Sequence, residues 1–190
     1  MNDDISRRAL ALGLGASALL PATALAQNDD TYSEPEIVEA AGRFFGAGAE
    51  GVAAVVSHVF SDLGRPNGYI QGEEGSGAIG VGLRYGDGRL RLKSRGGTTR
   101  VYWQGPSLGF DTGGNASKVF TLVYNMSDPD QIFQRYPGVE GTAYFVGGVG
   151  VNYQERNGVT LAPMRAGVGF RLGANLGYLA YSRRRRLNPF

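Results

Sequence analysis

Four polar residues occupy the same position in four similar segments of the sequence. In each segment, small residues alternate with bulky apolar ones before the polar residue. Because successive side chains of a strand point to opposite faces, the four polar residues are predicted to share one face and gather near one rim of a curved sheet. The segments are Gly80–Gly86, Ser107–Gly113, Gly148–Tyr153 and Gly167–Gly173, and their polar residues are Arg84, Asp111, Asn152 and Arg171.

Two interpretations of this polar face are open. Paired arginines are well suited to an anionic head group or a sugar acid, which predicts a ligand site. Alternatively, Arg84 or Arg171 forms an ion pair with Asp111 that only orders the face. Trp103 is a further candidate ligand contact beside Tyr102. Its ring can stack on a sugar, or it can fill the core or a sheet edge.

A run of four arginines near the C-terminus is a candidate contact for an anionic surface. Arginines near a charged membrane contribute about 1 kcal/mol each, so the run suits phospholipid or lipopolysaccharide phosphates. A solvated tail is the other interpretation. The four residues are Arg183, Arg184, Arg185 and Arg186.

The sequence does not support a catalytic or a metal site. The only histidine, His58, lies off the apolar stripe of its helix, and a general base needs a positioned partner. The absence of cysteine excludes disulfides, thiolate zinc sites and a thiol nucleophile. The carboxylates lack the spacing of a calcium or magnesium site. We therefore predict no catalytic residue, no metal and no cofactor.

The segment Asp111–Lys118 invites two enzymatic interpretations, and both fail on its context. A phosphate loop ends in Gly-Lys-Ser/Thr and opens a helix, whereas a strand pattern follows here. An aspartic protease needs a second carboxylate of the same kind. The remaining enzymatic alternative is a cell-wall or glycan hydrolase that pairs Asp111 with Glu140 or Glu155.

Helical periodicity is found before Gly64, and Pro129 in a first turn with Pro137 after the end predicts a further short helical connection over Asp128–Arg135. Ser33 and Glu36 have capping-box spacing, and apolar residues then recur at the i, i+3, i+4 spacing of one helix face. The same spacing returns after a glycine-rich interruption. We predict two amphipathic helices, or one interrupted helix, with these apolar faces: Ile37, Ala40, Ala41, Phe44 and Phe45; Val52, Val55, Val56, Val59 and Phe60.

From Tyr69 onward the apolar period becomes two, with turn signals at Gly86–Gly88, Gly113–Asn115 and Asn157–Gly158. This pattern predicts a mainly β fold, a small soluble antiparallel β-barrel of about eight strands with the helical segment packed against it. The predicted strands are 69–72, 77–85, 89–94, 99–104, 107–112, 116–125, 142–154, 159–171 and 174–182. The bulky face is expected to fill the barrel, and the glycine face to lie outside or to be covered by a helix. The predicted interior set is Val81, Leu83, Leu108, Phe110, Val149, Val151, Val168 and Phe170.

The N-terminus predicts export. Arg7 and Arg8 precede an apolar run too short to span a bilayer, and the small-residue site that ends at Ala26 follows. The signal is either of the twin-arginine type or an ordinary one with adjacent arginines. We expect a cleaved signal peptide over 1–26, a helical segment over 27–64 and a barrel domain over 65–190. The net charge of +2 is too small to indicate nucleic-acid binding.

Three segments carry a resemblance to a known family. They are GPSLGFDTGGNASKVFTLVYN over 105–125, YPGVEG over 136–141 and RLNPF over 186–190. The chain resembles the envelope integrity protein A family. The resemblance implies a soluble periplasmic protein with an eight-stranded β-barrel that supports the envelope under stress and has no assigned enzymatic activity. Ser107–Lys118 is also similar, more distantly, to the lipid-binding SYLF domains.

These observations together predict a non-enzymatic periplasmic protein that supports envelope integrity and stress resistance by binding an envelope component. The expected partners are anionic lipid, lipopolysaccharide or another envelope protein, with no nucleic acid and no integral membrane segment. The hydrolase remains the alternative.

Overall fold

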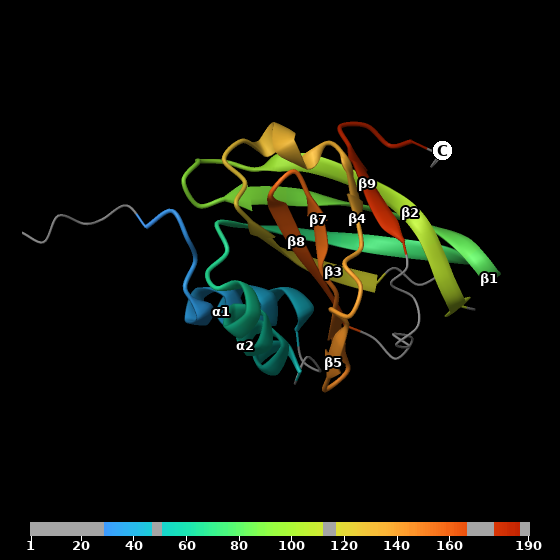
Figure 1. The fold of residues 1–190 in the computed structure, drawn as a ribbon, viewed down its shortest axis with the longest axis horizontal. Helices are drawn as coiled ribbons and strands as arrows, with labels where there is room; N and C mark the ends of the chain where they lie inside the picture. The colour runs from blue at the N-terminus through green and yellow to red at the C-terminus, as the bar shows by residue number, and fades with distance from the viewer. Residues whose placement is uncertain (1–28, 47–50, 112–116, 167–176, 187–190) are drawn as a thin grey trace, which may run out of the picture.

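The fold is a curled antiparallel sheet with two helices against one of its faces (Figure 1). The computed structural model describes residues 29–46, 51–111, 117–166 and 177–186, and the side chains of these except 76–82 and 107–111. The mainly β prediction is confirmed. The elements are α1 (Glu34–Phe45), α2 (Val52–Leu63), β1 (Gly68–Leu92), β2 (Thr99–Asp111), β3 (Ser117–Tyr124), the 3-10 helix η1 (Pro129–Ile132), β4 (Arg135–Pro137), β5 (Tyr144–Val146), β6 (Val149–Val151), β7 (Gln154–Arg156), β8 (Val159–Ala166) and β9 (Tyr178–Ser182).

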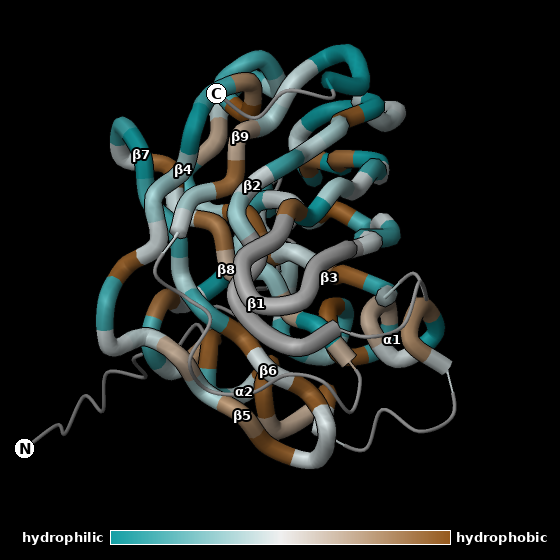
Figure 2. Tube along the Cα trace, turned by 90° about the vertical axis from the view of Figure 1, so that its right-hand side faces the viewer, coloured by the Kyte–Doolittle hydropathy of each residue, from teal (hydrophilic) through white to brown (hydrophobic). Residues whose placement is uncertain are grey.

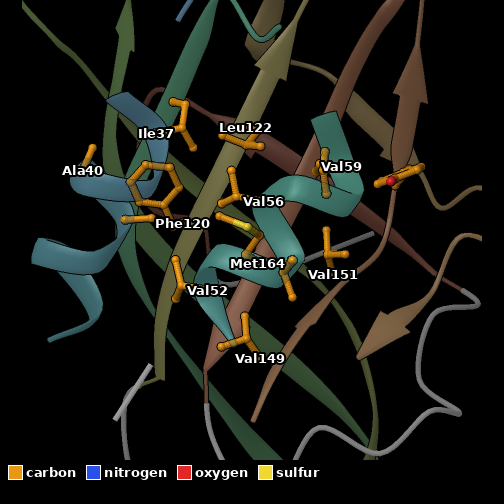
Figure 3. Packing of buried hydrophobic residues seen from close by; sticks show 14 of the residues in the cluster. Ile37, Ala40, Val52, Val56, Val59, Phe120, Leu122, Val149, Val151 and Met164 are labelled. Carbon is orange, nitrogen blue, oxygen red and sulfur yellow. The ribbon is translucent and has the colours of Figure 1, made fainter. Parts of the chain in front are cut away.

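Local chemistry accounts for the start of α1 and for the ends of both helices. The backbone N–H of Ser33 donates to Glu36 Oε2 at 2.7 Å, which is half of a capping box before α1. Gly46 ends α1 at φ 82° and Gly64 ends α2 at φ 74°, values that favour glycine. The predicted apolar stripes face the sheet (Figure 3).

The first strand doubles back on itself. The backbone N–H of Lys93 donates to the carbonyl of Asn67 at 3.0 Å, so the two ends of β1 lie side by side. Its earlier half pairs with β3 and its later half with β2, which makes two antiparallel runs of one element. The predicted turn at Gly86–Gly88 is wrong, since these residues pair in register with Val101–Trp103 of β2.

The sheet curls until its two sides meet. Neighbouring strands pair in antiparallel fashion in the order β4-β9-β2-β1-β3-β8, and β7 pairs with the outer edge of β8. An antiparallel bridge between Gly138 and Gln154 then connects the β4 side to the β7 side. The backbone N–H of Val139 adds a bond to the carbonyl of Tyr153 at 2.9 Å. This junction gives the described part of the sheet the shape of a barrel.

Alternation along β3 separates two apolar cores. Phe120 and Leu122 belong to the core between the sheet and the helices, whereas Val119 and Val123 belong to the interior of the curled sheet. The interior core also contains Trp103, Tyr136 and Tyr181 from other strands. Both faces of β3 are therefore buried, and burial of apolar area stabilises them by about 25 cal/mol per Å².

The glycine and bulky faces lie opposite to the prediction wherever their side chains are described. Val149 and Val151 pack against the helices rather than in the interior, and Leu83 is partly exposed outside both cores. On β1 the reason is the indole of Trp103, which occupies the interior: a Cβ on Gly86 would lie 2.2 Å from it, and one on Gly72 2.6 Å. The side chains of Val81, Leu108 and Phe110, and residues Val168 and Phe170, lie outside the described set.

Replacement of Gly86 by alanine should destabilise the protein. The new methyl group would overlap the buried indole of Trp103, and overpacking of this kind costs about 1–3 kcal/mol. Urea unfolding followed by tryptophan fluorescence measures the loss. Gly75→Ala is the matched control, because its Cβ would meet nothing within 4 Å. Equal stabilities of the two variants would contradict the role assigned to Gly86.

Candidate binding site

A buried carboxylate lies at one end of the barrel interior. Glu74 of β1 is 7% exposed and receives hydrogen bonds at both oxygens. Arg165 Nε donates to Oε1 at 3.0 Å and its Nη2 donates to Oε2 at 3.2 Å. Trp103 Nε1 donates to Oε2 at 2.8 Å, and Arg84 Nη1 lies 3.6 Å from Oε1. We call Glu74, Arg84, Arg165 and Trp103 the Glu74 cluster.

Pleating and register bring the Glu74 cluster together from distant parts of the chain. Arg165 stands opposite Val119 in the pairing of β8 with β3, and therefore shares the inward face. Arg84 lies in the later half of β1, opposite Gly105, and its Nε donates to the carbonyl of Pro106 at 3.1 Å. The arginines thus approach Glu74 from two sides of the barrel.

The electrostatics of the cluster favour an ionised Glu74. Burial by itself would raise the pKa of this carboxyl group. The positive charges of Arg165 and Arg84 outweigh burial, helped by hydrogen bonds from Arg165 and Trp103, and hold the pKa of Glu74 below its usual value. Burial raises the pKa of the nearby Tyr181, so its hydroxyl stays neutral. The cluster is therefore a charged network inside a largely apolar barrel.

A small cleft adjoins the Glu74 cluster, with room for about one water molecule. Gln154 and Asn152 are 5% and 4% exposed there. Gln154 Oε1 is buried with no hydrogen-bond partner among the described residues. Asn152 Oδ1 accepts from Arg165 Nη1 at 3.4 Å, and this is the side-chain bond that the described structure shows for Asn152. The cleft is lined by Arg84, Pro106, Asn152, Gln154, Gly177, Tyr178 and Leu179.

Three of the five ligand-binding residues predicted from the sequence meet around this cluster. Arg84 and Asn152 lie at the cleft, and Trp103 is a buried core residue whose indole contacts Glu74. The side chain of Asp111 and the whole of Arg171 lie outside the described residues. Arg84 and Asn152, which occupy equivalent positions in two of the repeated segments, therefore lie together at the cleft.

Sequence reasoning missed Glu74 and Arg165, which hold the cluster together. Both interrupt otherwise inward-facing apolar residues: Glu74 follows Ile70 at even spacing, and Arg165 follows Leu161. A charged residue in register with a core face requires a partner of opposite charge. That signal was present for each residue separately, but the pairing spans 91 positions in the chain.

The arginine run lies elsewhere. All four side chains are exposed, and Arg183 Nη2 pairs with Asp130 Oδ2 at 2.5 Å. Arg185 Nη2 is 3.8 Å from Asp87 Oδ1. The run therefore contacts the outer surface of the barrel and η1 rather than the Glu74 cluster, and whether it meets an anionic partner stays a prediction.

The remaining candidate residues of the sequence lie on the surface. His58 stacks on Tyr144 with ring centroids 3.8 Å apart, and its Nε2 is 3.4 Å from Asp62 Oδ2. Glu140 and Glu155 are exposed. Within the described ranges, no three potential ligands gather as a metal site, and no helix has the length and apolarity to cross a membrane.

Comparison with known proteins places the chain in a family. The model of the family described as envelope integrity protein A matches residues 30–190. The chain is similar to a beta-barrel-like, uncharacterized protein from Brucella abortus whose crystal structure is known, with 49% identity and a TM-score of 0.77. The match covers 85% of this chain and 99% of that one. No curated protein matched the chain.

Replacement of Glu74 by glutamine should destabilise the fold by about 3–5 kcal/mol, because it leaves two arginines near the interior without their carboxylate. Chemical denaturation at neutral pH measures the change. Glu73→Gln is the matched control, since Glu73 is the exposed neighbour of Glu74. If Glu74→Gln lost no more stability than Glu73→Gln, the pairing of Glu74 with the two arginines would not stabilise the fold.

The stability of the protein should fall in acid partly through Glu74. Its pKa is lower in the folded state than in the unfolded state, so the unfolded state binds more protons as pH decreases. The stabilisation is complete above the unfolded pKa of about 4.3 and is lost as pH falls through the folded pKa. The free energy of unfolding of Glu74→Gln should therefore decline less steeply below pH of about 4.3 than that of the wild type. If the free energy of unfolding declined equally steeply in the two proteins, the lowered pKa of Glu74 would be contradicted.

Proposed function

Since the chain belongs to the envelope integrity protein A family, we propose that it supports the cell envelope by binding an envelope component rather than by catalysis. In this proposal the protein is exported by a cleaved signal over 1–26 and works in the periplasm, outside the bilayer. Its role includes resistance to envelope stress. The proposed partners are anionic lipid, lipopolysaccharide or another envelope protein.

The observation that carries the proposal is the unpartnered Oε1 of Gln154 beside the cleft. A buried polar atom without a partner costs about 1–3 kcal/mol, so its retention calls for an explanation. A hydroxyl or amino group of a ligand would supply the missing donor. Asn152 offers its amide nitrogen at the same cleft, and Arg84 adds a positive charge to the lining.

The chemistry of the cleft suits a small polar group that projects from a larger molecule. Its size excludes burial of a whole lipid tail or sugar chain. In a head group that carries both, a hydroxyl offers the donor that Gln154 needs and phosphate oxygens offer acceptors for Asn152 and Arg84. Head groups of this kind occur in both of the anionic partners named above.

The variant Gln154→Leu separates ligand binding from stability. Removal of the unpaired oxygen should leave the free energy of unfolding equal or raise it by about 1 kcal/mol. Cells that lack the gene should regain resistance to a membrane-disrupting detergent with the wild-type gene and fail to do so with this variant. Gln71→Leu, the same exchange at a partly exposed position of β1, should restore resistance.

Native mass spectrometry of protein purified from its own periplasm then tests the ligand directly. A retained adduct is expected on the wild type and on Gln71→Leu, with occupancy about tenfold lower on Gln154→Leu if about 1.4 kcal/mol of binding is lost. Equal adducts on the wild type and Gln154→Leu would remove the cleft as the ligand site. Full complementation by Gln154→Leu would have the same consequence.

A further inference from the structure

The outer surface of the curled sheet is covered by helices on one side only. The helices pack on β3, β5 and β6. Figure 1 shows the two helices below the sheet. The outward residues of β2, β4, β9 and the later half of β1 belong to neither apolar core. This outer surface carries Arg89, Arg100 and Arg135, which are exposed, and the arginine run follows β9. We call Arg89, Arg100, Arg135 and Arg183–Arg186 the arginine face.

The arginine face is unfavourable for the fold by itself. Arg89 stands directly opposite Arg100 in the pairing of β1 with β2, and like charges in that position destabilise a sheet. Asp87 lies between them and the arginine run, 2.6 Å from Arg100 and 3.8 Å from Arg185. One carboxylate thus serves two arginines, and Arg89 has no ion-pair partner among the residues described. Pairing within the sheet does not account for this arrangement.

Aromatic rings hold several guanidinium groups against the surface. Arg100 lies over Tyr102 with 5.4 Å to the ring centroid, and Arg135 lies over Tyr178 at 4.1 Å. Arg183 similarly lies over Phe133 at 4.4 Å. Such contacts fix the direction of the charge without neutralising it. Tyrosine beside arginine is also the combination found where proteins meet the polar head groups of a membrane.

Charge is distributed unequally between the two sides of the molecule. Residues 29–46 and 51–65, which include both helices, hold six acidic residues against two arginines. In Figure 2 hydrophobic segments gather around α2, β5 and β6, whereas hydrophilic segments extend over β4 and β7. The net charge of +2 therefore hides an acidic helical side and a basic sheet side. A negatively charged plane would orient such a molecule with its arginine face inward.

We propose that the arginine face docks on the surface of a membrane that contains anionic phospholipid. The inference rests on the proposed envelope role for its location, but it uses a surface other than the cleft. Charge complementarity favours lipid phosphates over a protein partner. A stable protein interface needs buried apolar anchors, and the large apolar side chains exposed in the described structure, Val139 and Phe145, lie outside the strands of the arginine face.

Co-sedimentation with vesicles tests the proposal. The full exported protein should bind vesicles of phosphatidylglycerol and phosphatidylcholine, and release as ionic strength rises and the Debye length falls below about 10 Å. Vesicles of phosphatidylcholine alone should bind little. The double variant Arg89→Glu with Arg100→Glu should bind the anionic vesicles at least about tenfold more weakly.

The matched control is Arg43→Glu with Arg65→Glu, which makes the same change in charge on the helical side. Each double variant also breaks surface ion pairs, so their stabilities should be similar. The control should retain most of the binding. An equal loss in both variants would show that net charge alone drives binding and would overturn the proposal. Binding to soluble lipopolysaccharide but not to the anionic vesicles would also overturn it.

The cleft variant distinguishes this proposal from the proposed function. Gln154→Leu should bind anionic vesicles as the wild type does, because Gln154 is buried away from the outer surface. A wild-type protein that carries no cleft adduct but binds anionic vesicles would contradict the proposed function and support the arginine face. A cleft adduct on a protein that does not bind anionic vesicles would support the proposed function and contradict the docking of the arginine face.

Discussion

The structure depends on the need to pair a carboxylate that lies inside the barrel. Glu74 loses its hydration on folding, and an isolated charge in that position would be prohibitive. Arg165 from β8 and Arg84 from the later half of β1 satisfy it, with the indole of Trp103 as an additional donor. These contacts connect three strands across the interior, so the closed curvature of the sheet and the ionised state of Glu74 require each other.

A single pattern of alternation then produces three environments. On β3, inward valines join the barrel core and outward Phe120 and Leu122 join the helix core. The helices cover one side of the barrel. The opposite outer surface is left to arginine and tyrosine, and the polar end of the interior is left to the cleft. The two proposed binding contacts lie at these two places, the outer arginine surface and the cleft, which are not used in packing the apolar cores.

Features set by neighbouring residues were predicted correctly, whereas a glycine with a distant partner was misinterpreted. The capping box at Ser33 and the left-handed glycines Gly46 and Gly64 act within a few residues, so both helices were predicted closely. The turn at Gly86–Gly88 was wrong because glycine served a different purpose there. Its missing side chain admits Trp103 from the neighbouring strand rather than allowing the chain to reverse. The inverted face of β1 has the same origin, since a large indole takes up space that the bulky face was expected to fill.

By itself the sequence determined the mainly β class, the two helices and the shared face of Arg84 and Asn152, because periodicity, capping and alternation are local properties of the chain. Only the tertiary structure decided which sheet face is interior, since that choice depends on the fit of distant side chains. It also decided the partner of Glu74, because Arg165 is 91 residues away and contacts it only when the sheet closes. Electrostatic pairing over such a separation follows from the closure of the barrel and leaves no mark in local spacing.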